Sequence, residues 1–189
     1  MTRKIRKSTV PDAGGWMPGA RRAGTYRRWL EEQGSLTARI IAACPAGAPF
    51  SVRVLHHGDA RPCFDERALI GLPPGRCARS RDVLLLSGRT PVVYAHTVVA
   101  RDHLRRPWHL MDRVGGRALG TVLFSDPCIG RGGLAFSRID GRHPLFQRAV
   151  AWTARKPPTL WARRATFSLG GCPMLVTEVF LPEILELKQ

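Results

Sequence analysis

A chain of 189 residues, of which 44% are hydrophobic, is long enough to bury one sizeable core, and we expect one folded domain. No apolar run reaches the roughly 20 residues that cross a bilayer, and the basic start of the chain lacks the apolar segment of a secretory signal. Five scattered cysteines without a C-x-x-C pair argue against a disulfide framework and against a structural zinc site. The cytoplasm is the expected location.

The formal net charge is +16, from 30 basic and 14 acidic residues. Such a charge is compatible with nucleic-acid binding, but no zinc finger, RNA-binding aromatic signature or helix-turn-helix accompanies it. The basic residues are nearly all arginines spread along the chain, which an arginine-favouring genome also explains. A third explanation is a small anionic substrate, because the guanidinium fork matches carboxylate geometry. We expect no nucleic-acid partner.

The first half of the chain predicts two helices followed by strands. Residues 1–24 are rich in Gly, Pro, Arg and Lys, and we expect a mobile basic extension ahead of a domain that spans residues 25–189. Thr25 is a suitable cap for a helix over 26–33 that Gly34 ends, and Ser35 for a second helix over 36–43. Alternating apolar residues predict strands over 50–57, 81–87 and 91–99, with turns at 58–59 and 88–90.

The second half predicts short helices and a final hairpin. A short helix within 101–113 and another over 117–124 precede a strand over 130–139, which two glycines weaken. Residues 140–158 are expected to form a basic helical insertion. The hairpin has strands at 160–169 and 173–181, joined through Gly170 and Gly171. Hairpin-linked strands with helices grouped between them predict an α+β fold with a single antiparallel sheet and helices packed on it.

One carboxylate interrupts the last strand, which is apolar on both faces and therefore belongs in the middle of a sheet. Glu178 shares its pleat face with three apolar residues. Burying an unpaired carboxylate costs several kcal/mol, so Glu178 needs a cationic partner, a proton or a ligand. An ion pair with Arg163 or Arg164 on the neighbouring strand is the simplest explanation.

Common catalytic and metal-binding motifs are absent. None of the six histidines belongs to H-E-x-x-H or has a carboxylate at ligand spacing, so we expect solvated or structural histidines and no metal. The sequence has no G-x-S-x-G elbow and no dinucleotide fingerprint. The glycine-rich segment 130–133 lacks the Lys-Ser/Thr ending of a phosphate loop, and Cys128 lacks a nearby base.

Four segments resemble the chorismate pyruvate-lyase family, whose members open ubiquinone biosynthesis in bacteria. They are WLEEQGSLTARI (29–40), SRDVLLLSGRTPVVYAHTVV (80–99), GGRALGTVLF (115–124) and LWARRATFSLGGCPMLVTEVFLP (160–182). The similarity covers about residues 25 to 183, and its most specific parts are Leu-Gly-x-x-Leu-Phe and Thr-Glu-x-Phe-Leu-Pro. It implies helical flaps over a buried ligand site between sheet and helices.

The resemblance implies ligand-binding residues one at a time. Arg81 in RDVLLL matches the strand arginine, which fits the ring carboxylate. Glu178 matches the glutamate of the final motif, which accepts a hydrogen bond from the ring hydroxyl at the opposite end. Either Glu178 also takes the C4 proton as general base, or the proton passes to the enolpyruvyl group.

Two further residues follow from the same resemblance, and two arginines are candidates by their position. Leu119 matches a backbone contact, and Leu36 stands where the family often has Met, as an apolar wall of the flap. Arg131 and Arg138 follow the Leu-Phe block and are candidates for the second carboxylate of the substrate. The segment 139–159 is longer than the family pattern, so the resemblance does not place it relative to the pocket.

The implied activity is conversion of chorismate to 4-hydroxybenzoate and pyruvate by an elimination that aromatisation drives, with no cofactor. We expect a cytoplasmic monomer whose partners are this substrate and product, and slow release of the enclosed product. An alternative is a non-catalytic domain of the same fold that binds a small acid, as in transcription regulators. Twenty-four residues ahead of the first helix are too few for the DNA-binding domain of such a regulator. A further alternative is a sister enzyme that makes an isomeric hydroxybenzoate.

Overall fold

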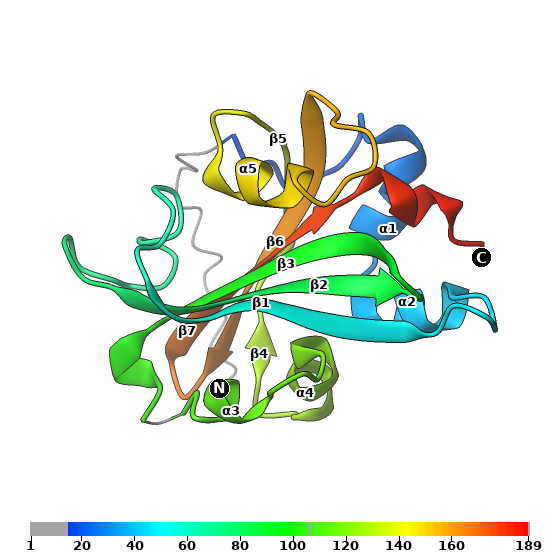
Figure 1. The fold of residues 1–189 in the computed structure, drawn as a ribbon. Helices are drawn as coiled ribbons and strands as arrows, with labels where there is room; N and C mark the ends of the chain where they lie inside the picture. Colours follow the sequence, from blue (N-terminus) through cyan, green and yellow to red (C-terminus); the bar gives the residue numbers. More distant parts are fainter. Residues whose placement is uncertain (1–14, 106, 189) are drawn as a thin grey trace, which may run out of the picture.

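The computed structural model describes residues 15–105 and 107–188, and in this part of the chain the strands form one antiparallel sheet (Figure 1). The seven strands follow the order β1-β2-β3-β7-β6-β4, and β5 also pairs with β6. The α+β prediction is confirmed. The strands are β1 (Phe50–Ala60), β2 (Ala78–Ser87), β3 (Thr90–Ala100), β4 (Gly130–Arg131), β5 (Ala135–Asp140), β6 (Thr159–Leu169) and β7 (Cys172–Phe180).

Two long hairpins form most of the sheet, and their turns are at the predicted positions. Gly88 turns β2 into β3, and Gly170 and Gly171 turn β6 into β7, all three with positive φ angles of 57°, 56° and 78°. Glycine adopts this conformation without the penalty that a Cβ brings. Because β7 pairs with both β3 and β6, it is an inner strand, which explains its apolar residues on both faces.

The helices are short. They are α1 (Arg27–Leu30), α2 (Leu36–Ala43), α3 (Leu110–Arg113), α4 (Leu119–Ser125) and α5 (Pro144–Val150), with 3₁₀ turns η1 (Gly24–Tyr26), η2 (Arg101–His103) and η3 (Pro182–Glu186). The range of α2 is as predicted, because the Ser35 side chain accepts a hydrogen bond from the Ala38 amide (3.3 Å).

Three predicted boundaries are wrong. The first helix ends at Leu30 because the Arg163 side chain occupies the carbonyls that a further helical turn needs. The turn expected at 58–59 lies inside β1, where both residues pair with β2. The strand expected at 130–139 is divided into β4 and β5, and the Gly132 amide between them binds the Thr166 carbonyl (2.8 Å).

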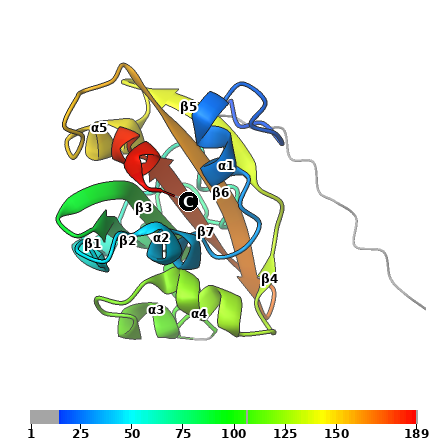
Figure 2. The same cartoon turned by 90° about the vertical axis from the view of Figure 1, so that its right-hand side faces the viewer.

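The two faces of the sheet pack against different segments (Figures 1 and 2). On one face, called here the pocket face, α1, α2 and η3 cover one end, and α3 and α4 cover the other. The opposite face packs against α5 and against the irregular segment 61–77. Alternation along the strands assigns consecutive side chains to these two faces, so α5 and the rest of the insertion at 140–158 lie away from the pocket face.

The segment before η1 is packed on the sheet. Trp16 is buried, its indole Nε1 donates to Asp65 (2.8 Å), and the main chain of Met17 pairs with that of Phe136. Residues 15–24 are therefore not the mobile extension that we expected, because an aromatic anchor and a β-bridge hold them. Residues 1–14 lie outside the described part. No helix in the described part is long and apolar enough to span a bilayer.

Candidate active site

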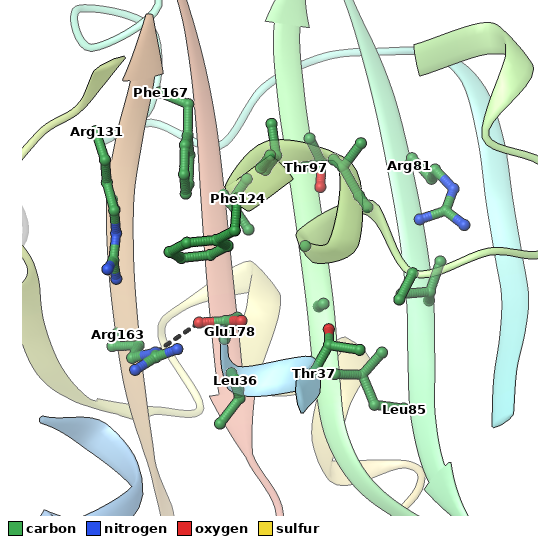
Figure 3. Close-up of a pocket in the computed structure, with 18 residues that line it drawn as sticks. Leu36, Thr37, Arg81, Leu85, Thr97, Phe124, Arg131, Arg163, Phe167 and Glu178 are labelled. Atoms are coloured by element: carbon green, nitrogen blue, oxygen red, sulfur yellow. Dashed lines mark hydrogen bonds and ion pairs between the residues drawn. The ribbon is translucent and has the colours of Figure 1, made fainter. Parts of the chain in front are cut away.

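A cavity lies between the pocket face of the sheet and the helices α2 and α4 (Figure 3). Its volume of about 50 Å³ holds a few water molecules. Most of its lining is apolar: Leu36, Val83, Leu85, Ala95, Ala118, Leu119, Leu123, Phe124, Ala165, Phe167 and Val176. The charged groups of the lining are three arginines and one glutamate, which gives the cavity a positive balance suited to an anion.

Arg81 on β2 marks one end of the cavity. Its side chain is 2% exposed, and one terminal nitrogen, Nη2, donates to the carbonyls of Gly115 (2.8 Å) and Arg117 (3.0 Å) just ahead of α4. Its Nε is buried without a hydrogen-bond partner, and Arg81 forms no ion pair with any described residue. Burial lowers the pKa of Arg81 from its ordinary value. A buried cation without a counter-ion is costly, so this end favours an anionic ligand.

Glu178 on β7 marks the other end. It lies directly opposite Arg163 of β6 in the ladder, and Arg163 Nε donates to Glu178 Oε2 at 2.6 Å. The predicted ion pair therefore exists, and its partner is Arg163. The next residue, Arg164, projects to the opposite face and binds Asp65 (2.7 Å). Glu178 retains 19% exposure of its side chain and lines the cavity, so it has both a partner and access to a ligand.

The two helices that cover the cavity meet at a glycine. Gly120 on α4 faces Thr37 on α2, and a Cβ built on Gly120 would lie 2.9 Å from Thr37 Oγ1. That distance is shorter than side chains tolerate, so the close approach of α2 and α4 depends on the missing side chain. The two helices together form the cover over the cavity.

The sequence matches the family model described as chorismate lyase over residues 21–188. A probable chorismate pyruvate-lyase from Nitrosospira multiformis is 47% identical over 161 residues, covering 85% of this chain and 88% of that protein. Another from Aromatoleum aromaticum is 46% identical over 172 residues, covering 90% and 91%. The chain belongs to the chorismate lyase family. It is a lyase, and its family implies a small-molecule substrate.

Solved structures with low sequence identity share the fold. A GntR-family transcriptional regulator from Enterococcus faecalis has a TM-score of 0.50 and 12% identity, and the match covers 70% of this chain and 90% of that one. The ligand-binding domain of a putative GntR-family regulator from Bordetella bronchiseptica has a TM-score of 0.50 and 13% identity, with 71% and 85% covered. At such identities the likeness concerns the fold alone.

The four residues that the chorismate lyase resemblance implied all line the cavity, and so does Arg131. Leu36 projects from α2, and Leu119 begins α4. Arg131 lies 5.2 Å from the Phe124 ring and 5.9 Å from the Phe167 ring, and its Nη1 donates to the Gln33 carbonyl. Burial, and then the proximity of a second arginine, lower the pKa of Arg131.

Arg138 does not reach the cavity. It is exposed on β5, the strand that flanks β6 on the side away from β7, and its Nε donates to Thr159 Oγ1 (2.7 Å). The expectation rested on its place after the Leu-Phe block, but β4 and β5 follow one another along the same edge of β6, so Arg131 lies opposite Phe167 and Arg138 lies farther along, opposite Trp161. Arg138 is therefore no longer a candidate for binding the second carboxylate.

Arg163 is the site residue whose importance sequence reasoning underestimated. It entered only as a possible ion-pair partner, yet it lines the cavity and also contacts the main chain of α1 and of the turn before α2. A signal for it was available, because the two-residue turn at Gly170 and Gly171 sets residue 163 opposite residue 178. Three other lining residues, Thr37, Thr97 and Phe167, had no signal beyond their places on the expected elements, whereas Phe124 ends the Leu-Gly-x-x-Leu-Phe motif.

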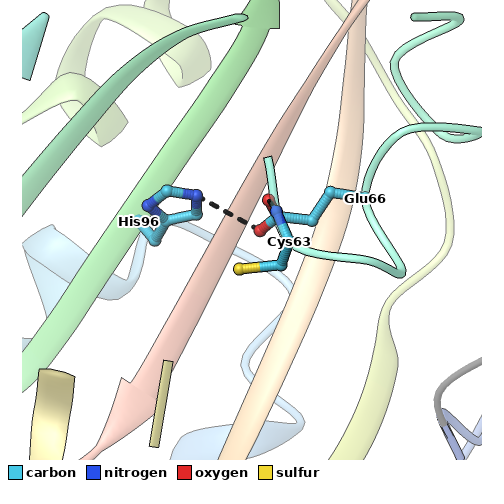
Figure 4. A group of neighbouring side chains, drawn as sticks. All are labelled: Cys63, Glu66 and His96. Carbon is cyan, nitrogen blue, oxygen red and sulfur yellow. Dashed lines mark hydrogen bonds and ion pairs between the residues drawn. The ribbon is translucent and has the colours of Figure 1, made fainter. Parts of the chain in front are cut away.

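A second buried cluster lies on the opposite face (Figure 4). The ligand atoms of Cys63, Glu66 and His96 all lie within 4.8 Å of one another. His96 Nδ1 is 2.5 Å from Asp82 Oδ1, and its Nε2 is 3.2 Å from Glu66 Oε1. Burial alone would lower the pKa of His96, but Glu66 and Asp82 raise it to about 9. Both ring nitrogens thus face carboxylates, and we interpret the cluster as an imidazolium held by ion pairs.

Proposed function

We propose that this protein converts chorismate into 4-hydroxybenzoate and pyruvate, the first step of ubiquinone biosynthesis. The observation that carries the proposal is the buried Arg81 guanidinium, which lacks a counter-ion at one end of an apolar cavity. At the other end, the Arg163–Glu178 pair offers a hydrogen-bond acceptor to a hydroxyl. A flat molecule with a carboxylate at one end and a hydroxyl at the other matches both ends.

The substrate is held by its two carboxylates. Arg81 binds the ring carboxylate through Nε, which no described group of the protein occupies, and the apolar walls that include Leu36 and Leu119 enclose the ring. The main-chain amide of Leu119, at the start of α4, is available to a ligand oxygen. Arg131 lies at the Glu178 end, where it binds the carboxylate of the enolpyruvyl group.

The reaction breaks the C3–O bond and removes the hydrogen from C4, so the ring becomes aromatic and enolpyruvate leaves and becomes pyruvate. The arginines stabilise the charge on the departing group, and the closed cavity excludes water. Glu178 accepts a hydrogen bond from the ring hydroxyl and fixes the ring. Because Arg163 already engages Oε2 of Glu178, we assign the C4 proton to the departing enolpyruvyl group rather than to this carboxylate.

Incubation of the purified protein with chorismate tests the proposal. We expect 4-hydroxybenzoate, identified by chromatography with ultraviolet detection, and an equal amount of pyruvate in a coupled assay. An isomeric hydroxybenzoate would replace the proposed product, and tight binding of a small acid without turnover would indicate an effector-binding domain. Pathway membership is tested by complementation of a bacterium that requires added 4-hydroxybenzoate to make ubiquinone.

A further inference from the structure

Arg163 contacts two parts of the molecule that are far apart in the sequence. Its Nε donates to Glu178 at the end of the cavity. Its Nη1 lies within hydrogen-bond distance of three main-chain carbonyls, those of Trp29 (3.4 Å), Leu30 (3.1 Å) and Glu32 (2.8 Å). These carbonyls belong to the end of α1 and to the turn before α2. One buried side chain, 2% exposed, therefore joins β7 to the hairpin formed by α1 and α2.

The turn that Arg163 holds leads directly into the residues that wall the cavity. Leu36 and Thr37 follow it at the start of α2, and both line the cavity. Within the turn, the Glu32 side chain binds the Gly34 amide (2.7 Å) and Arg39 (2.7 Å), so the turn is internally braced. A braced turn moves as a unit with α2, and the position of Arg163 therefore bears on whether the cover is closed.

We propose that Arg163 is a positioning residue that latches the α1–α2 hairpin, residues 24–43, over the cavity and couples its closure to Glu178. Lifting the hairpin removes the carbonyl acceptors from a buried guanidinium, which is unfavourable because a buried cation needs partners. The latch itself is a property of the protein without ligand. Its effect on substrate and product rests on the proposed function.

The coupling acts in both directions. A ligand hydroxyl that binds Glu178 steadies the carboxylate and, through it, the Arg163 fork, so ligand binding favours the closed hairpin. Conversely, a closed hairpin holds Glu178 at the place where the ligand hydroxyl arrives. Lysine cannot replace this function, because a single ammonium group cannot reproduce the planar fork that serves Glu178 and the carbonyls at once.

Amide hydrogen exchange of the ligand-free protein tests the latch. Arg163→Gln and Arg163→Lys are compared with Arg164→Gln, the adjacent arginine on the opposite face, and with Arg138→Gln, an exposed arginine outside the cavity. We expect both Arg163 variants to accelerate exchange over residues 26–43 about tenfold relative to α5, which corresponds to the loss of one hydrogen bond to a charged group. Arg138→Gln leaves the hairpin unchanged, and Arg164→Gln shows no selective acceleration there.

Product dissociation provides the second readout. In stopped-flow experiments, Arg163→Lys releases 4-hydroxybenzoate about tenfold faster than the wild type, while its single-turnover rate falls less than that. Hairpin exchange at the wild-type rate in a folded Arg163 variant would overturn the proposal. If Arg163→Gln does not fold, Arg163→Lys decides. If the wild-type protein does not convert chorismate, the proposed function is refuted but the hydrogen-exchange result still holds. The proposed function and the latch can therefore fail independently.

Discussion

On the face covered by α5 and the segment 61–77, each of three buried carboxylates has a cationic partner: Asp65 binds Arg164, and Asp82 and Glu66 hold His96. Burial would raise the pKa of Asp65, but His143, Trp16 and Arg164 lower it to about 2. On the pocket face, three arginines face one carboxylate, and Arg81 has no counter-ion within the described structure. On the first face the buried charges are neutralised within the protein, whereas on the pocket face the uncompensated charge of Arg81 favours an anionic ligand.

The largest effect should follow from removing the unpaired charge. We expect Arg81→Met to lower kcat/KM for chorismate about a thousandfold, because truncating one partner of a buried charge pair costs several kcal/mol. Its free energy of unfolding should change by less than about 1 kcal/mol, because the loss of two hydrogen bonds to carbonyls is offset by the removal of a buried charge without a counter-ion. Steady-state kinetics and urea unfolding measure both. A variant that keeps its activity, or that is strongly destabilised, would make Arg81 structural.

Substitutions of Glu178 test the opposite end of the cavity from Arg81. Glu178→Ala should reduce turnover about a hundredfold, because the ring hydroxyl loses its acceptor. Glu178→Gln keeps an acceptor oxygen and should stay within about tenfold of the wild type. Both variants leave Arg163 without its carboxylate, so they are matched in that respect. Single-turnover rates of 4-hydroxybenzoate formation decide, and equal losses in the two variants would assign the C4 proton to Glu178.

The elements that could be predicted depend on local rules. The two hairpins follow from alternation and glycine turns, and α2 follows from the Ser35 cap. The end of α1 could not be predicted, because the acceptors of its last turn bind Arg163, more than 130 residues away. For the same reason the His96 cluster was missed: its carboxylates come from β2 and from the segment 61–77. Proximity along the chain likewise misplaced Arg138.

Paired charge on the opposite face should give the fold a pH-dependent stability. The pKa of His96 is raised from about 6.5 to about 9, so its contribution is complete below about pH 6.5 and is lost as the pH rises through 9. Arg148 of α5 also faces Asp82 (3.6 Å). Cys63 and Tyr94 stay neutral in this range because burial raises the pKa of each.

His96→Gln removes the group that titrates. We expect it to lower the free energy of unfolding by about 2 kcal/mol at about pH 6, and the difference from the wild type to shrink toward zero above about pH 9. Urea unfolding across this range measures the difference, with chorismate turnover as the control for the pocket face. A difference that does not change with pH would mean that His96 is neutral and that its carboxylates are satisfied in another way.

The smallest effect concerns the contact between the two halves of the cover. Gly120→Ala places a methyl group against Thr37 Oγ1 and should separate α4 from α2 slightly, accelerating release of 4-hydroxybenzoate by up to about tenfold. Gly116→Ala is the matched control, since a Cβ there meets nothing within 4 Å. Thr37→Ala in the Gly120→Ala background removes the clashing oxygen and should restore slow release. Acceleration that persists in this double variant would place the effect in the α4 backbone and not between the helices.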